Sequence, residues 1–259
     1  MARLKTARAQ FDDRLSLVDH LDELRNRIIV ALVALGVAFA LCFWQNPLLL
    51  DIANEPLPAN TPVPLTFGVT EPFFTTVEVS AYGAMILALP VVLYQLYAFV
   101  LPAFSPQERR TVTPFLIAMP ILFIAGVAFA YFVVMPVAVK FLLNFNDAEF
   151  NIQVRARDYY SFFGLMLVAM GLLFQIPIAM LSVTRLGIVA PEWFAQNRRY
   201  AIFIIAVVSA AAPGGDPVSM IMIMIPLLLL YEGSIAVAKR FGRPREEPLG
   251  TEVSPGEAG

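Results

Sequence analysis

Six long apolar segments, none of which contains a lysine or an arginine, dominate the sequence. They run roughly over Ile28–Trp44, Val77–Phe104, Phe115–Val139, Phe162–Val183, Tyr200–Ala212 and Val218–Val237. A helix needs about 20 apolar residues to cross the hydrocarbon core of a bilayer, and most of these segments approach that length. The segments and their connections use nearly all of the chain, so no separate soluble domain fits. The sequence therefore predicts an all-α membrane protein with six transmembrane helices.

The basic residues are distributed unevenly between the connections. Fifteen of the 18 lysines and arginines lie before the first segment, after the last one, or in the second and fourth connections. The other three are Lys140, Arg155 and Arg157, and the first connection has none. Short loops rich in lysine and arginine stay on the cytoplasmic side. We therefore expect a multi-pass protein of the cytoplasmic (inner) membrane with both termini in the cytoplasm.

Several classes of function have no support in the sequence. Cys42 is the only cysteine and His20 the only histidine, so neither a disulfide framework nor a histidine-based metal site is expected. No phosphate-binding loop, GxSxG or HExxH motif is present. The basic residues are not interleaved with aromatic ones as in a nucleic-acid surface. We expect no enzyme activity, no metal, no cofactor and no nucleic-acid partner.

The segments outside the long spans differ in composition, and each composition predicts a different local structure. Residues 14–27 read as an amphipathic cytoplasmic helix that continues into the first span. Six prolines over residues 46–74 favour an extended, rigid cap on the opposite side. The fifth apolar segment, at thirteen residues, is too short for the hydrocarbon core. We expect residues 1–240 to form the membrane domain and residues 241–259 a disordered cytoplasmic tail.

Three polar residues are candidates for a role beyond packing. Glu23 either binds a ligand or forms a surface ion pair with Arg27, its neighbour one helical turn away. Glu108 is the only acid of its short cytoplasmic loop and is either a solvated charge or a second ligand-binding carboxylate. Gln175 lies in the middle of the fourth span, where an amide needs a partner; an interhelical hydrogen bond is the simple interpretation.

Two other classes of function remain open on these residues. A secondary transporter would use a polar path near Gln175 and Glu78. An intramembrane enzyme would need a nucleophile or metal cluster that the sequence does not display.

Ordered motifs distinguish between these possibilities. They are Asp19-His-Leu-Asp-Glu-Leu-Arg-Asn-Arg27, Glu71-Pro-Phe-Phe-Thr75, Pro90-Val-Val-Leu-Tyr-Gln-Leu-Tyr-Ala-Phe-Val-Leu-Pro-Ala-Phe104, Glu108-Arg-Arg110, Ala128-Phe-Ala-Tyr-Phe-Val-Val-Met-Pro136, Phe174-Gln-Ile-Pro177 and Pro213-Gly-Gly-Asp-Pro-Val-Ser219. In this order, from about residue 15 to 240, the sequence resembles the TatC family, the core membrane subunit of the twin-arginine protein translocase.

The resemblance implies a concave, glove-like bundle of six helices that receives signal peptides bearing two adjacent arginines. It also implies export of folded proteins driven by the proton gradient, in an oligomeric complex with single-span TatA/TatB-type subunits and membrane lipid. Glu23 and Glu108 match the carboxylates that receive the two arginines. Three further residues match the same cytoplasmic surface, namely Arg25, Phe99 and Phe104. Pro56 matches a proline of the first extracytoplasmic loop, and Asp216 matches the acid of the last turn.

The sequence departs from the family in two places. Many relatives carry glutamate where this chain has Gln175, and an amide does not titrate. The last turn often reads Pro-Pro-Asp, whereas Gly214 and Gly215 separate Pro213 from Asp216 here.

Overall fold

The structure is a computed structural model that describes residues 2–58, 61, 63–101, 106–146, 149, 152–185, 188–211 and 216–241. Its helices are α1 (Ala2–Trp44), α2 (Asn46–Asn54), α3 (Glu71–Val100), α4 (Pro106–Phe129), α5 (Met135–Asn144), α6 (Ala156–Leu173), α7 (Ile176–Arg185), α8 (Pro191–Gln196), α9 (Arg198–Ala211) and α10 (Pro217–Phe241). A π-helical turn, Ala130–Val134, joins α4 to α5. Extended pairing in the described ranges is limited to one isolated parallel bridge, between Leu65 and Arg155. The all-α prediction is confirmed.

Five helical stretches are long and apolar enough to cross a membrane. They are His20–Trp44, Glu71–Val100, Ala118–Asn144, Ala156–Arg185 and Pro217–Arg240. The predicted fifth segment forms α9, which has only 14 residues and is therefore about 21 Å long. The second span begins earlier than predicted, at Glu71 instead of Val77, because Pro72 is well tolerated in the first turn of a helix.

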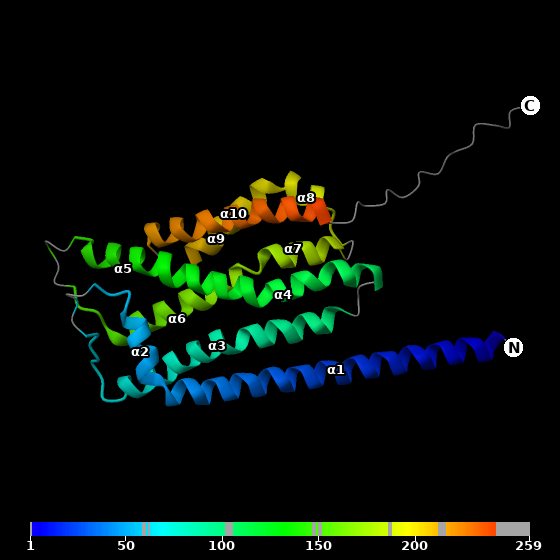
Figure 1. Cartoon of the computed structure of the whole chain (residues 1–259), viewed down its shortest axis with the longest axis horizontal. Helices are drawn as coiled ribbons and strands as arrows, with labels where there is room; N and C mark the ends of the chain where they lie inside the picture. The colour runs from blue at the N-terminus through cyan, green and yellow to red at the C-terminus, as the bar shows by residue number, and fades with distance from the viewer. Residues whose placement is uncertain are drawn as a thin grey trace, which may run out of the picture.

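The long helices run roughly along one direction in a layered bundle, and the short helix α2 lies across them (Figure 1). α3 packs on α1 and on α6, α4 packs on α6, and α10 packs on α7 and α9. α1 begins, and α10 ends, at the same end of the bundle, while α2 lies at the other end (Figure 1). This arrangement requires an even number of crossings, and α9 supplies the sixth.

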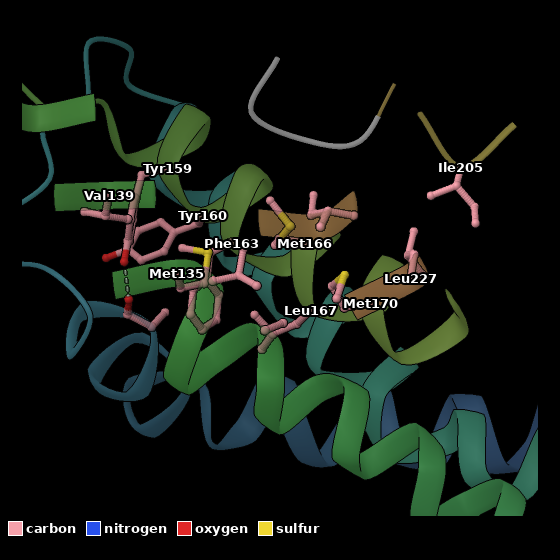
Figure 2. Packing of buried hydrophobic residues seen from close by; sticks show 14 of the residues in the cluster. Met135, Val139, Tyr159, Tyr160, Phe163, Met166, Leu167, Met170, Ile205 and Leu227 are labelled. Atoms are coloured by element: carbon pink, nitrogen blue, oxygen red, sulfur yellow. Dashed lines mark hydrogen bonds between the residues drawn. The ribbon is translucent and has the colours of Figure 1, made fainter. Parts of the chain in front are cut away.

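The main core surrounds α6 (Figure 2). Tyr159, Phe163, Met166 and Met170 of this helix are buried in one apolar cluster, to which the neighbouring helices also contribute. The Tyr159 hydroxyl donates a hydrogen bond to the backbone oxygen of Ala53, which ties α6 to the end of α2. α6 is therefore the central helix of the core.

Glycines let neighbouring helices approach α6 closely. A Cβ atom at Gly126 of α4 would lie 2.7 Å from the backbone oxygen of Met170 and 2.8 Å from Cγ of Phe174. Gly171 of α6 faces the Phe123 ring of α4 in the same way. Without a hydrophobic force between helices in lipid, such close approach is a main source of helix association.

An apolar hollow of about 560 Å³ opens between α2, α3, α4 and α6. Its walls include Ile86 of α3, Ile124 of α4 and Phe163 of α6. The bundle is therefore concave, as the resemblance implied.

The predicted extended cap over residues 46–74 is wrong in its first part. Residues 46–54 form the helix α2, and Pro47 lies in its first turn, where a backbone N–H has no intrahelical partner. Among the later prolines, Pro56, Pro58 and Pro64 lie in irregular chain after α2, whereas Pro72 lies in the first turn of α3.

The amphipathic segment 14–27 is part of α1, which starts at Ala2 and continues into the first span without a break. Of the side chains in α1, those from His20 onward are described. The predicted tail, 241–259, lies outside the described residues except for Phe241, the last residue of α10.

Candidate functional site

An open groove lies between α1 and the last turns of α3, and it contains Glu23, one of the polar residues singled out by the sequence. It has a volume of about 500 Å³ and is lined by Asp22, Glu23, Asn26, Arg27, Val30 and Gln95. We call it the α1–α3 groove.

Helical spacing explains its composition. Glu23, Asn26, Arg27 and Val30 are separated by three, four and seven residues, which places them on one face of α1. Gln95 reaches the same groove from α3. Because α1 is continuous, the height of these polar groups along the bundle is set by the first span itself.

Glu23 and Arg27 form an ion pair that extends to α3. The Arg27 Nε and Nη2 groups both donate hydrogen bonds to Glu23 Oε1, the former at 3.0 Å. Arg27 Nη1 donates to Gln95 Oε1 at 3.1 Å. The Glu23 side chain is 37% exposed and that of Arg27 23%. The ion-pair alternative is thus present in the structure, and it leaves the carboxylate open to solvent.

An aromatic contact lies beside this pair. The His20 ring stacks on Phe99 of α3, with ring centroids 4.3 Å apart and an interplanar angle of 15°. His20 Nδ1 is 3.9 Å from Glu23 Oε2. The sequence indicated Phe99 through the resemblance, but nothing in the sequence predicted that His20 would join it to Glu23.

The other predicted members of this surface are placed differently. Arg25 is exposed and does not line the groove, because two residues along a helix turn it by about 200° away from Glu23. Glu108 is the third residue of α4, but its side chain lies outside the described residues, as does all of Phe104. α4 begins near the end of α3 (Figure 1), so the backbone brings Glu108 to the same end of the bundle.

Gln175 occupies a break between α6 and α7. Its Nε2 donates long hydrogen bonds to the backbone oxygens of Met119, at 3.3 Å, and of Gly171, at 3.4 Å. Its Oε1 is buried and has no hydrogen-bond partner among the described residues. Pro177 lacks the N–H that would continue the ladder of α6, which explains the break. The predicted interhelical hydrogen bond is therefore present, to the backbone of α4.

The transporter alternative would need Glu78 and Gln175 to face a common polar path. Glu78 accepts hydrogen bonds from the hydroxyls of Ser161 and Tyr82. Neither Glu78 nor Gln175 lines the apolar hollow between α2, α3, α4 and α6.

The two remaining predicted residues have local surroundings. Asp216 Oδ1 accepts the backbone N–H groups of Val218 at 3.1 Å and Ser219 at 2.8 Å, so it caps the N-terminus of α10. Pro56 is half-buried in the turn after α2. The glycines at 214 and 215 lie outside the described residues.

An ion pair that the sequence did not predict joins the two loops at the α2 end of the bundle. Arg155 Nε donates to Glu71 Oε1 at 2.8 Å, and Glu71 Oε2 accepts the N–H groups of Phe67 and Gly68. The hydrogen bond to the carboxylate raises the pKa of the Arg155 guanidinium. The backbone of Leu65 pairs with the residues on either side of Arg155: its N–H donates to the oxygen of Val154, and its oxygen accepts the N–H of Ala156. Glu71 and Arg155 are 84 residues apart in the sequence, and no local pattern pairs them.

No group of three or more His, Cys, Asp or Glu side chains suited to a metal ion occurs in the part of the chain that the structure describes.

These features define an all-helical, multi-pass membrane protein with an open groove, lined by acids and one arginine, at one end of its bundle. Residues 19–226 match the family model described as Sec-independent protein translocase protein (TatC). The chain belongs to this family, and the resemblance seen in its motifs is confirmed. The family is one of translocase components, so the protein is not an enzyme.

Curated relatives and solved structures agree with this assignment. The Sec-independent protein translocase protein TatC of Carboxydothermus hydrogenoformans is 33% identical over 236 residues, which cover 91% of this chain and 97% of the relative. That of Aquifex aeolicus is 35% identical over 235 residues, covering 89% and 98%. A crystal structure of the twin-arginine translocase receptor TatC superposes with a TM-score of 0.76 at 34% identity, covering 86% of this chain and 100% of the other.

Proposed function

We propose that this protein is the signal-peptide receptor and core subunit of a twin-arginine translocase, and that the α1–α3 groove receives the arginine pair. The translocase exports folded proteins across the cytoplasmic membrane and draws on the proton gradient. Twin-arginine signal peptides and single-span TatA/TatB-type subunits are its partners, in an oligomeric complex surrounded by lipid.

The observation that carries this proposal is the position of Glu23. Its carboxylate is partly exposed, lies in an open groove, and is held at a constant height by the continuous helix α1. The crystal structure that superposes on the chain is that of a twin-arginine translocase receptor. A groove that is open and acidic suits a cationic segment of an extended peptide.

The chemistry of the two groups explains a preference for arginine. A guanidinium presents a planar fork of N–H donors that a carboxylate accepts in a bidentate manner, which an ammonium group cannot reproduce. A second carboxylate, Glu108, would read the second arginine from the first turn of α4. Charge-assisted contacts of this kind contribute about 1–3 kcal/mol each, which suits a receptor that releases its ligand.

The orientation follows from the charge asymmetry of the loops. The end at which α1 begins and α10 ends carries Lys239 and Arg240, whereas the α2 end carries few basic residues. The positive-inside rule then places the groove and both termini in the cytoplasm. Single cysteines at Val69 and Arg240, in a Cys42→Ala background, should be labelled from opposite sides of the membrane. Labelling of both from one side would contradict this orientation.

Binding of signal peptides tests the function. Purified protein should capture an Arg-Arg signal peptide and should capture its Lys-Lys variant poorly. Glu23→Ala and Glu108→Ala should each weaken capture without a matching loss of melting temperature, because exposed ion pairs add little to stability. Gln175→Leu is the control and should leave capture intact. Equal capture of both peptides by the unmodified protein would refute the proposal.

A further inference from the structure

The carboxylate that we assign to a signal arginine already holds an arginine of the chain itself. Arg27 directs two donors, Nε and Nη2, at the single oxygen Oε1 of Glu23. Its third donor, Nη1, is held by Gln95 on α3. The guanidinium therefore occupies the position that an incoming guanidinium would need.

The charge of the groove makes this occupation significant. Its lining contains two acids, Asp22 and Glu23, and one base, Arg27. The second oxygen of Glu23 lies 3.9 Å from His20 Nδ1, beyond hydrogen-bond distance. A cation that bound this oxygen alone would share one negative charge with Arg27 and would be repelled by it.

We propose that Arg27 is an internal occupant of the recognition carboxylate and a specificity-determining residue, which a signal arginine must displace. This inference rests on the proposed function of the groove. A signal guanidinium supplies the same planar fork of donors that Arg27 gives up, so the exchange between the two changes the free energy little. An ammonium group has donors but no planar fork, so it matches the geometry of the Glu23 carboxylate less well than the guanidinium it would displace.

The surroundings of Arg27 allow such an exchange. The pair with Glu23 is a partly exposed contact between residues four apart on one helix, and ion pairs of this spacing contribute only weakly to stability. The hydrogen bond to Gln95 keeps the displaced side chain close to the groove. The alignment of α1 on α3 does not depend on Arg27, because Ala38, Cys42, Ala84 and Ala88 form a separate buried cluster between these helices.

Peptide affinities of two variants test the inference. Arg27→Gln removes the charge and the fork at little cost in helix propensity. It should tighten binding of the Lys-Lys peptide about tenfold and of the Arg-Arg peptide about threefold, so that discrimination falls. Arg27→Lys keeps the charge but not the fork, and it should lower discrimination by a smaller factor. Arg240→Gln, which removes one charge from the same end of the bundle in α10, is the matched control and should change neither affinity.

Each outcome has a defined meaning. Weaker binding of both peptides by Arg27→Gln, or an unchanged ratio, would overturn the inference and make Arg27 a residue that positions Glu23. The same gain in Arg240→Gln would also overturn it, because the effect would then be one of general charge. Failure of the proposed function would give a different result. If the groove does not receive the signal arginines, Glu23→Gln, which retains Arg27, would bind the Arg-Arg peptide as well as the unmodified protein does.

Discussion

The packing of α4 on α6 provides a sharp test of the fold. Gly126→Ala adds one Cβ atom that would lie 2.7 Å from the backbone oxygen of Met170 and 2.8 Å from the Phe174 ring. Ordinary contacts of a Cβ atom begin near 3.4 Å, so α4 and α6 must separate locally by roughly 0.7 Å. A backbone oxygen cannot turn aside as a flexible side chain does. We expect a loss of about 1–3 kcal/mol, which is typical of overpacking.

A matched substitution isolates this effect. Gly36 lies in the exposed part of α1, and a Cβ atom there would meet nothing within 4 Å. Gly36→Ala makes the same chemical change in a helix and should stabilise the protein by about 0.5–1 kcal/mol, because alanine loses less backbone entropy. Thermal unfolding of both variants in detergent should show Gly126→Ala melting several degrees below, and Gly36→Ala at or above, the unmodified protein. If Gly126→Ala melted as high as Gly36→Ala, the close approach of α4 to α6 would be refuted.

Three further predictions concern other elements. Asp216→Ala should destabilise the protein by about 1 kcal/mol, while Asp216→Asn, which still caps α10, should melt near the unmodified protein; equal melting of all three would exclude the capping role. Glu71→Gln should speed proteolysis of the loop before α3, because Arg155 loses its charged partner; a cleavage rate equal to that of the unmodified protein would show that the pair does not order the loop. Insertion of four apolar residues after Val207 should impair export but not peptide binding, because α9 at about 21 Å is shorter than the ~30 Å core and we expect the bilayer to thin beside it; normal export would remove any role for its shortness.

The helices were predictable because lipid imposes a simple condition on the sequence. Every backbone group in the hydrocarbon must be paired within its own segment, so a long apolar run without basic residues is a helix. The short fifth segment was visible in the same way and forms α9. The helix α2 was missed because its flanking prolines dominated the interpretation of residues 46–74, although Pro47 fits a first helical turn.

Contacts between distant residues were beyond reach of the sequence. The exposure of Glu23 and its pairing with Arg27 follow from helical spacing, but the link of Arg27 to Gln95 spans 68 residues and depends on how α1 packs on α3. Arg25 was grouped with Glu23 by the resemblance, whereas helical rotation turns it away from the groove. The bond between Glu71 and Arg155 depends on two loops meeting, and no local pattern encodes that meeting.

The central claim, that the α1–α3 groove receives the arginine pair through Glu23, is tested most directly by crosslinking. A photoreactive amino acid in place of Asn26, an exposed residue of the groove lining, should crosslink to an Arg-Arg signal peptide. We predict strong crosslinking to that peptide, weak crosslinking to its Lys-Lys variant, and loss of the Arg-Arg product when Glu23→Gln is added. Equal crosslinking of the two peptides, or an Arg-Arg product undiminished by Glu23→Gln, would contradict the account.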